Sequence, residues 1–391
     1  MKNLNNEFQE VFGTAKEPSQ FFAPGRINLI GEHTDYNGGH VFPAAISFGT
    51  YALGSKRNDL KFRFYSMNFA ETGIIECDLK DLRYKEKHDW ANYPKGMIKY
   101  IMESGFPITR GADILYYGDI PNGAGLSSSA SIEMATGVLL ENLFDLEIDR
   151  IQMITLGQKV ENDYIGVNSG IMDQFAIGMG KLDHAILLNC QTLKYEYAPI
   201  KLDNHAILII NTNKQRTLAG SKYNERRTQC EHALRDLKTE LAIDSLGVLT
   251  SEQFEQHKHL IQDEINRKRA RHAVTENVRT VVALKKLQAG DLGAFGKLMN
   301  ESHQSLKYDY DVTGVELDTI VEAAWDVEGV LGARMTGAGF GGCAIAIVEK
   351  DKIENVKQHV NTTYRNTVGY DATFYTAAIS DGAKQMTEGV L

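Results

Sequence analysis

The segment from Pro24 to Tyr36 places four side chains that could do chemistry within ten residues, namely Arg26, Glu32, His33 and Asp35. Carboxylates accept hydrogen bonds from sugar hydroxyls, whereas Arg and His donate them. The segment therefore suits a polyol ligand. A surface turn with local ion pairs explains the composition equally well, so the residue types alone leave both possibilities open.

A glycine- and serine-rich segment, Pro121–Ser131, leads directly into a stretch with helical periodicity. Glycines let the backbone approach a ligand closely, and the free amides at a helix start point at whatever lies there. With the helix dipole and three consecutive hydroxyls, this arrangement is typical of a phosphate-binding loop. The alternative is an ordinary turn with one serine N-cap, but three serines exceed what one cap needs. It is not a Walker A loop, because no Gly-Lys-Ser/Thr follows.

A third segment, Thr336–Cys343, has GxGxxG spacing at Gly337, Gly339 and Gly342. A dinucleotide-binding fingerprint must follow a strand and open a helix. Here an apolar strand, expected at residues 344–348, comes after the glycines, so we reject a dinucleotide site. We expect instead a tight loop pressed against another backbone.

Acidic candidates lie between the second and third segments. Glu161 and Asp163 are two positions apart near a helix end, so they project about 200° apart and only one can face a given site. Asp173 stands among apolar residues such as Ile171 and Phe175. A carboxylate in such surroundings is paired or shifted in pKa, which is the usual setting of a general base, although a helix cap explains it more simply.

The elements that must position these residues alternate between strands and helices. Strand-like runs alternate between apolar and polar residues, and the predicted helices carry an apolar face with a period of about 3.6 residues or begin at a capping box. The pattern predicts an α+β protein with two domains, residues 1–190 and 191–391, and extensive contacts across a soft boundary. The expected strands lie at residues 49–57, 61–67, 114–117, 185–188, 205–210, 343–348 and 372–379, and the expected helices at 131–146, 149–164, in the charged stretch up to about 290, and at 315–326.

Composition narrows the class of protein. The chain has 391 residues and a net charge of −9, with 43% apolar residues, which is ordinary for a soluble globular protein of two domains. The acidic balance argues against a nucleic-acid partner, and the short basic stretch at residues 267–271 is expected to be a solvated helix face. No apolar run approaches the length of a spanning helix, so no membrane is expected. Four widely spaced cysteines predict reduced thiols in the cytoplasm, and we expect a monomer.

The three segments, in this order and spacing, resemble the signature motifs of the GHMP small-molecule kinases. The first, Gly25 to Tyr36, is similar to the galactokinase signature at each position, and the similarity extends over nearly the whole chain. The resemblance implies a two-domain GHMP kinase fold, α+β with mixed sheets, and an active site in the cleft between the domains. It also implies ATP-dependent phosphorylation of the anomeric hydroxyl of D-galactose, the first step of galactose catabolism, with Mg²⁺ as a cofactor.

The resemblance assigns roles to individual residues. Asp173 would take the proton of the anomeric hydroxyl, and Arg26 would keep it ionised and stabilise developing charge. The remaining assignments fall into three groups: Glu32, His33, Thr34, Asp35 and Tyr223 for the sugar; Ser66, Gly123, Ala124, Gly125, Leu126, Ser127, Ser128 and Ser129 for ATP; and Ser129 with Glu161 for Mg²⁺.

Two rival functions share these motifs. One is a kinase for a related sugar such as N-acetylgalactosamine, because pocket shape decides specificity. The other is a sensor that binds galactose and ATP without turnover. Such sensors lack a Ser-Ala pair in the phosphate loop, whereas Ser127–Ser131 reads intact here, so an enzyme is favoured.

Overall fold

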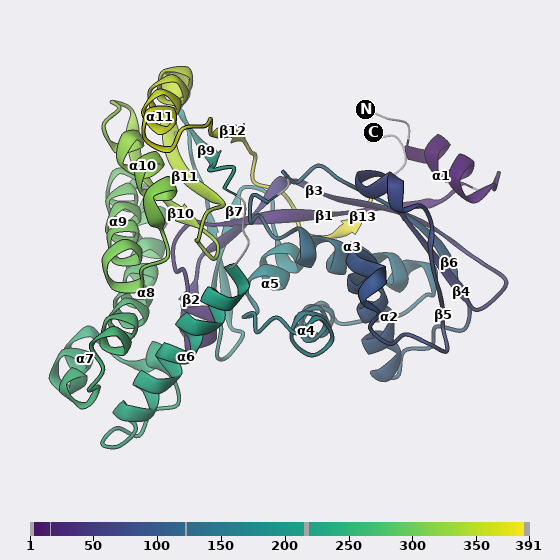
Figure 1. Cartoon of the computed structure of the whole chain (residues 1–391), viewed down its shortest axis with the longest axis horizontal. Helices are drawn as coiled ribbons and strands as arrows, with labels where there is room; N and C mark the ends of the chain where they lie inside the picture. Colours follow the sequence, from purple (N-terminus) through teal and green to yellow (C-terminus); the bar gives the residue numbers. More distant parts are fainter. Residues whose placement is uncertain (1–3, 16, 122, 215–218, 387–391) are drawn as a thin grey trace.

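A mixed six-stranded sheet forms the framework of the amino-terminal half (Figure 1). The computed structural model describes residues 4–15, 17–121, 123–214 and 219–386. The strand order is β13-β1-β3-β6-β4-β5, with β4 and β6 parallel and the other neighbours antiparallel. The strands span Ser19–Asn28 (β1), Pro43–Lys56 (β3), Lys61–Ser66 (β4), Ile75–Asp78 (β5), Ala112–Gly118 (β6) and Lys384–Gln385 (β13).

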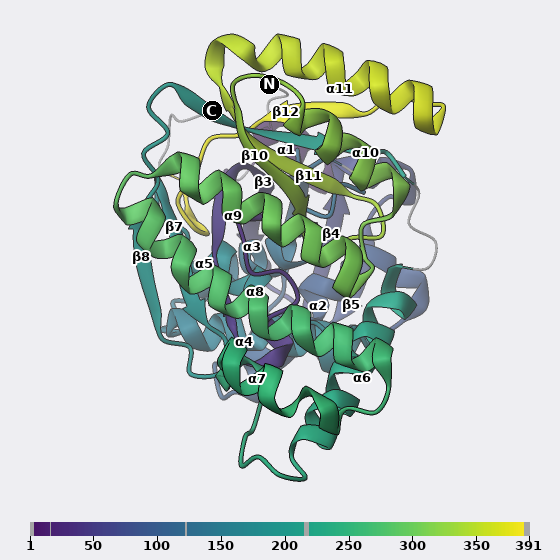
Figure 2. The same ribbon diagram turned by 90° about the vertical axis from the view of Figure 1, so that its left-hand side faces the viewer.

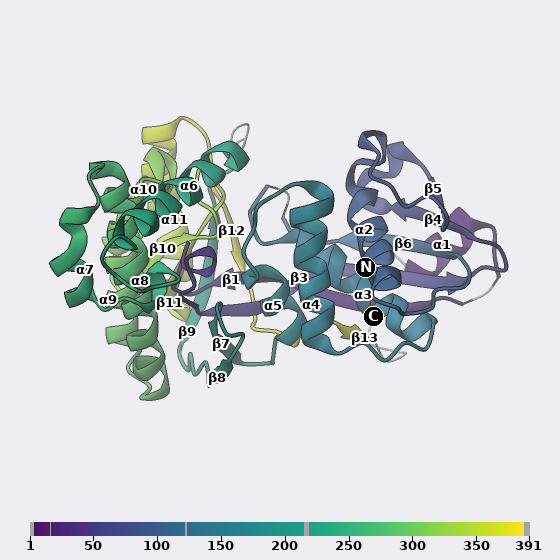
Figure 3. The ribbon, with the colours of Figure 1, turned by 90° about the horizontal axis from the view of Figure 1, so that it is seen from below.

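Helices cover this sheet unequally. The helices α3 and α5 pack on β1 and β3, and α2 and α4 pack against α3 (Figure 3). Period-two alternation sends Ala52 and Tyr116 into that core, while Leu53 and Leu115 turn to the other face and bury the apolar side of α1. The bounds are Leu4–Phe12 (α1), Asn92–Glu103 (α2), Ser128–Leu143 (α3), Arg150–Lys159 (α4) and Met172–Met179 (α5).

An antiparallel sheet of order β10-β11-β9-β12 organises the carboxyl-terminal half, with α10 and α11 on one face (Figure 2). Leu208 and Ile210 of β9 pack towards α10 and α11, whereas Ile207 and Ile209 face the opposite way. The strands are His205–Asn211 (β9), Val330–Thr336 (β10), Cys343–Glu349 (β11) and Thr373–Thr376 (β12); the helices are Ala219–Leu237 (α6), Ser251–His257 (α7), Glu264–Gln288 (α8), Leu292–Ser305 (α9), Gly314–Trp325 (α10) and Ile353–Val368 (α11).

The two halves share one hydrophobic cluster. Ile207 and Ile209 of β9 and Ile345 of β11 pack with Ile27 of β1 and Met299 of α9. The chain end also returns to the first sheet, where β13 pairs with β1. A small sheet of order β2-β7-β8 lies beside them, formed by His40–Val41, His184–Asn189 and Tyr195–Pro199. Contacts across the predicted boundary are therefore extensive, and the boundary itself stays a prediction.

Most predicted elements are present, with shifted ends. The helix predicted from residue 131 begins at Ser128, so all but one of the loop serines belong to its first turn. The helix predicted to end near 164 passes into a π-helical turn at Val160–Ile165. The helix α11 was not predicted, although its buried Val356, Val360 and Tyr364 recur every four residues.

The basic stretch at residues 267–271 lies on α8, but reading it as a solvated face was wrong for one residue. Arg269 is buried, and its guanidinium donates to the carbonyl oxygen of Asp309 at 2.6 Å and to Gln229 at 3.1 Å. Neighbouring oxygens therefore satisfy the buried guanidinium. Within the described residues, no helix is long and apolar enough to cross a membrane.

Candidate active site

A cavity of about 380 Å³ collects the three predicted segments at one place. The end of β1 and the loop after it, the start of α3, the start of α5 and the hairpin loop between β10 and β11 all contribute to its wall. Residues about 300 positions apart in the sequence therefore face one another. Its lining includes Arg26, Glu32, His33, Asp35, Gly123, Gly125, Leu126, Ser127, Ser128, Ser129, Glu161, Gly170, Asp173, Tyr223, Gly337 and Ala338.

Asp173 and Arg26 form a bidentate ion pair in the middle of this wall. The Arg26 Nε donates to Oδ1 of Asp173 at 2.8 Å, and its Nη2 donates to Oδ2 at 2.7 Å. Burial by itself would lower the pKa of Arg26, but the Asp173 carboxylate outweighs burial and raises it, so the guanidinium stays charged. Asp173 is not a helix cap, because its side chain bonds across to Arg26 and Ser127.

The loop before α3 is shaped by glycine and anchored to β1. Gly123 and Gly125 both have φ near +70°, a left-handed conformation that glycine adopts without steric cost. The Arg26 Nη1 donates to the carbonyl oxygen of Gly125 at 2.8 Å. Ser127 stands at the N-cap position, yet its hydroxyl makes no capping bond and donates to Asp173 instead. The simple serine cap is therefore not what the structure contains.

Ser129 and Glu161 lie together on one side of this loop. The Ser129 hydroxyl donates to Oε1 of Glu161 at 2.6 Å. Glu161 is buried, and burial raises its pKa. Asp163 points to solvent, so the angular argument that only one of these two acids can face the site is confirmed.

Asp35 and Tyr223 face the cavity from the other side. Asp35 lies against Gly170, where an added Cβ would come within 1.8 Å of the Asp35 Oδ2. Burial, and then the neighbouring charge of Asp173, raise the pKa of Asp35 to about 7. The Tyr223 ring packs against His33 with centroids 5.6 Å apart.

His33 is held by the protein at both ring nitrogens. Its Nε2 lies 3.2 Å from the carbonyl oxygen of Ala338, and its Nδ1 lies 2.8 Å from the hydroxyl of Tyr36. A carbonyl oxygen only accepts, so Nε2 carries the proton and Nδ1 accepts from Tyr36. Burial lowers the pKa of His33 to about 3, which keeps the ring neutral. The ring lines the cavity, but its polar atoms are already occupied.

Thr34 and Ala124 belong to the predicted segments but lie outside the lining of the cavity. Thr34 is buried, and its hydroxyl lies 2.8 Å from the backbone oxygen of Gly31 and 2.6 Å from that of His40, so its single proton binds one or is shared by both within the same loop. Ala124 is fully buried. The structure gives both residues a supporting place in their segments.

A smaller cavity of about 210 Å³ adjoins the first and contains Ser66. The two cavities share Ser128 and Ser129. The smaller one is lined by aromatic rings that the sequence reasoning did not single out, because nothing in their spacing marks them. Phe69 and Trp90 stack with centroids 6.4 Å apart, and Tyr93 and Tyr116 complete the wall.

The third glycine segment is the loop of the β10–β11 hairpin, pressed against other backbone as expected. An added Cβ on Gly339 would lie 2.4 Å from the carbonyl oxygen of Val312. A strand does precede the glycines, which the sequence reading missed, but a strand also follows, so the dinucleotide fingerprint is absent. The Gly337 amide donates to Oε1 of Glu32 at 2.7 Å, which places this loop directly beneath the site.

Family models match three parts of the chain. They are described as the galactokinase galactose-binding signature at residues 6–56, the GHMP kinases N terminal domain at 92–181, and the GHMP kinases C terminal at 283–366. A mevalonate kinase from Methanococcus jannaschii shares the fold, with a TM-score of 0.67, 19% identity and coverage of 94% of this chain and 100% of that chain. The fold and the site together define a GHMP kinase, an enzyme that uses ATP.

Relatives with higher sequence identity show which family among the GHMP kinases the chain belongs to. The galactokinase of Ligilactobacillus salivarius is 57% identical over 98% of this chain and 99% of its own, and that of Streptococcus mutans is 56% identical over 99% of both. The crystal structure of Lactococcus lactis galactokinase complexed with galactose has a TM-score of 0.96 and 54% identity, covering 98% of this chain and 99% of that one. The chain belongs to the galactokinase family.

Proposed function

We propose that the larger cavity binds D-galactose beside Glu32, Asp35 and Tyr223 and the phosphates of ATP along Gly123–Ser129, and that the γ-phosphoryl group passes to the anomeric hydroxyl. One observation carries this proposal: Asp173 is hydrogen-bonded to Ser127 of the Gly123–Ser129 loop and lines the same cavity as Asp35 and Tyr223. A base at that junction can reach a sugar hydroxyl and still lie beside the loop that holds the phosphates.

The hydrogen-bond donors around Asp173 indicate which of its carboxylate oxygens takes the proton of the sugar hydroxyl. Oδ2 accepts from both Arg26 and Ser127, whereas Oδ1 accepts only from Arg26 in the described hydrogen bonds. Each carboxylate oxygen has about two lone-pair sites, so Oδ1 has room for the anomeric hydroxyl. The proton passes to Oδ1 as the sugar oxygen bonds to the γ-phosphorus. The bond from that phosphorus to the bridging oxygen breaks, and its electron pair leaves with ADP.

Positive potential at the transferred group comes from fixed parts of the chain. Arg26 is charged and anchored at both ends, to Asp173 and to the Gly125 carbonyl. The amino terminus of α3 adds backbone amides and the positive end of its dipole. Phosphoryl transfer depends on positioning and charge neutralisation, and these groups need little rearrangement during the reaction. They let a chain of net charge −9 bind a polyanion.

We propose that Ser129 and Glu161 hold Mg²⁺ together with phosphate oxygens. Within the described residues, no group of three or more His, Cys, Asp or Glu could form an all-protein metal site. A buried carboxylate beside a hydroxyl, at the start of a phosphate loop, fits an ion that takes one or two protein ligands and completes its shell with phosphate and water. When bound, the ion would neutralise charge on the phosphates.

The smaller cavity is the proposed site of the nucleotide base. Its lining includes the rings of Phe69, Trp90, Tyr93 and Tyr116, which suit a purine by stacking, and it shares Ser128 and Ser129 with the larger cavity. Ser66 lies in that wall, where its hydroxyl accepts from the Asn68 amide at 3.3 Å. We therefore assign Ser66 to the base side of ATP. An intracellular nucleotide as co-substrate supports a cytoplasmic location.

A coupled assay of ADP release with galactose, glucose and N-acetylgalactosamine tests the proposed reaction. Galactose should support the largest kcat/KM, and phosphorus NMR should show the new ester at the anomeric carbon. Faster turnover of N-acetylgalactosamine would contradict the sugar assignment. ADP release that does not depend on any of these sugars would contradict the proposed reaction.

A further inference from the structure

The loop that carries Glu32 has a left-handed backbone on both sides of that residue. Gly31 has φ +94° and His33 has φ +60°, both in the left-handed region, where His is disfavoured. An added Cβ on Gly31 would lie 2.8 Å from the carbonyl oxygen of His40. Such a conformation persists only where surrounding groups hold it. The groups that hold this loop therefore decide where the Glu32 carboxylate points.

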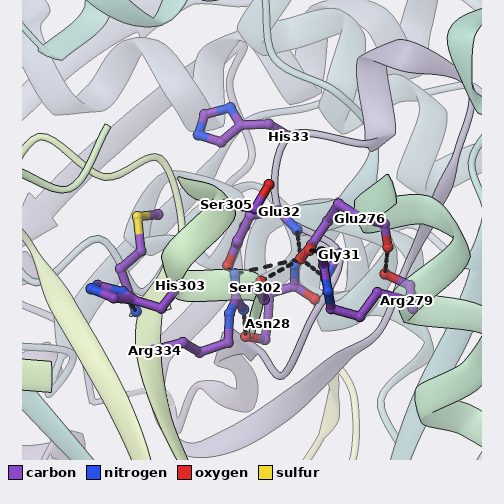
Figure 4. Close-up of polar contacts among 12 residues, drawn as sticks. Asn28, Gly31, Glu32, His33, Glu276, Arg279, Ser302, His303, Ser305 and Arg334 are labelled. Atoms are coloured by element: carbon purple, nitrogen blue, oxygen red, sulfur yellow. Dashed lines mark hydrogen bonds and ion pairs between the residues drawn. The ribbon is translucent and has the colours of Figure 1, made fainter. Parts of the chain in front are cut away.

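Glu276, from α8 in the other half of the molecule, reaches this loop (Figure 4). Its Oε1 accepts from the Gly31 amide at 2.9 Å, from the Glu32 amide at 3.4 Å and from the Ser302 hydroxyl at 2.6 Å. Its Oε2 is paired with Arg279. Burial would raise the pKa of Glu276, but Arg279, and then His272 and Arg334, outweigh it and lower the pKa to about 2. Glu276 is thus a fully buried carboxylate anion that accepts hydrogen bonds from the backbone amides of Gly31 and Glu32.

Arg334 connects the two acids from β10. It is fully buried, and its Nη1 donates to the carbonyl oxygen of Asn28 at 3.0 Å and lies 3.4 Å from Oε1 of Glu32. Its Nη2 lies 4.0 Å from Oε1 of Glu276, and neither Nη2 nor Nε has a hydrogen-bond partner among the described residues. One guanidinium therefore lies between two carboxylates, of which only Glu32 lines the cavity.

We propose that Glu276 is a positioning residue for the sugar site, which fixes the Gly31–Glu32 backbone and, through Arg334, the Glu32 carboxylate. The inference rests on the proposed role of Glu32 as a galactose ligand. Glu276 lines neither cavity, and it acts on the ligand only through the loop. Glu276 also connects the loop after β1, which carries Gly31 and Glu32, to α8 and, through Ser302, to α9 of the other half. The geometry of the site therefore depends on how the two halves pack.

The affinities of the Glu276→Gln variant for galactose and for ATP test the proposal. Glutamine keeps one acceptor oxygen but turns an amide donor towards Arg279 and removes the negative charge beside Arg334. The galactose Kd from titration calorimetry and the galactose KM should rise about tenfold or more, because hydrogen bonds to a buried charged group are lost. The ATP Kd should change less than about twofold, because the phosphate loop is untouched. Glu316→Gln, which alters a buried acid on α10 paired with Lys214, is the matched control.

A double-mutant cycle separates positioning from general destabilisation. In a Glu32→Gln background, adding Glu276→Gln should change the galactose Kd less than about twofold, because the two residues act through one contact. Equal losses of galactose and ATP affinity, or a full additional loss in that background, would overturn the proposal, as would an unchanged galactose Kd in the single variant. If the glutamine variant does not fold, the Glu276→Asp variant takes its place in the same measurements. Aspartate keeps the negative charge but places the carboxylate one methylene farther from the Gly31 and Glu32 amides.

The outcomes distinguish this inference from the proposed function. No galactose-dependent ADP release by the unaltered enzyme would count against the reaction. A normal galactose Kd in Glu32→Gln alone would count against Glu32 as a ligand. A rise of the galactose Kd in Glu32→Gln without one in Glu276→Gln would count against Glu276 and leave the role of Glu32 intact.

Discussion

Asp173 lies in contact with two of the segments that line the larger cavity, since it bonds to Arg26 of β1 and to Ser127 of the loop before α3. It is 27% exposed, enough to meet a ligand, while Arg26 at 6% exposure is almost fully covered. The guanidinium is thus shielded from water and keeps its full effect on the carboxylate and on a nearby phosphate. The Ser127 hydroxyl also donates to Oδ2 of Asp173. Arg26 and Ser127 together therefore hold the carboxylate in one orientation.

Asp173→Asn should abolish turnover and leave sugar binding almost unchanged. Asparagine is nearly isosteric, but it cannot accept the hydroxyl proton, so kcat should fall by about 10²-fold to 10⁴-fold. Galactose affinity, measured by calorimetry, should stay within a few-fold. Near-normal kcat would remove Asp173 as the base.

For Arg26→Ala we expect a similar loss of kcat, measured in the same assay. A rise in the galactose KM with unchanged kcat would show that Arg26 only binds the substrate.

Asp35 should give the enzyme a pH dependence near neutrality. Its pKa of about 7 in the free protein means that the carboxylate becomes protonated as the pH falls through 7. A protonated carboxyl is a weaker acceptor for a sugar hydroxyl, so kcat/KM for galactose should fall by up to about tenfold per pH unit below that point. His33, with a pKa of about 3, is not expected to contribute in this range. A profile whose acidic limb is unchanged in Asp35→Asn would contradict the assignment.

At the scale of elements, the segment before α5 lies close to the loop after β1 that carries Asp35. This close approach sets the position of the Asp35 carboxylate. This approach requires a glycine at position 170, where a Cβ would overlap the Asp35 carboxylate at 1.8 Å. The β1 strand is likewise in close contact with the phosphate loop, since a Cβ on Gly25 would lie 2.7 Å from the Leu126 carbonyl oxygen. Small residues at these places let three segments share one cavity.

Gly170→Ala should therefore impair the sugar side alone. The displaced Asp35 carboxylate should raise the galactose KM by about tenfold or more, while the KM for ATP stays within about twofold. Gly293→Ala on α9 is the control, because its nearest heavy atom is 4.0 Å from the added Cβ. Steady-state kinetics with each substrate varied in turn measure both constants. Equal changes in the two KM values would show a wider disturbance than the structure predicts.

At the scale of the whole molecule, the two halves should unfold together. Ile209, which is fully buried, packs in the cluster that contains Ile27 of the first sheet. Ile209→Ala should lower the free energy of unfolding by about 2–5 kcal/mol, whereas Val282→Ala, 38% exposed on α8, should change it by less than about 0.5 kcal/mol. Scanning calorimetry should show a single transition that moves as a whole. Two separate transitions would contradict a shared core.

Sequence reasoning singled out residues that the structure brings to one cavity, while their roles stay predictions. Gly123–Ser129, Glu161 and Asp173 could be singled out because glycine, serine and acid spacing report local backbone and helix geometry. The aromatic wall of Trp90 and Tyr93 was missed, since isolated aromatic residues are core residues as often as ligands. Arg269 was misread as solvated because local charge density does not reveal that Asp309 and Gln229 approach from elsewhere in the fold.

The residue types of the glycine-containing motifs indicated by themselves only a polyol and a phosphate, because these motifs encode local backbone conformations. The family and the reaction were indicated by the resemblance of the motifs to the GHMP kinase and galactokinase signatures. Only the tertiary structure decided that both ring nitrogens of His33 are occupied, that Thr34 closes its own loop, and that Glu276 and Arg334 reach Glu32. The Thr34 contact and the contact of His33 with Tyr36 are local, whereas the contacts of His33 with Ala338, of Glu276 with Gly31 and of Arg334 with Glu32 join residues about 240 to 300 positions apart. Local sequence carries no signal for such distances, because the packing of the two halves fixes them.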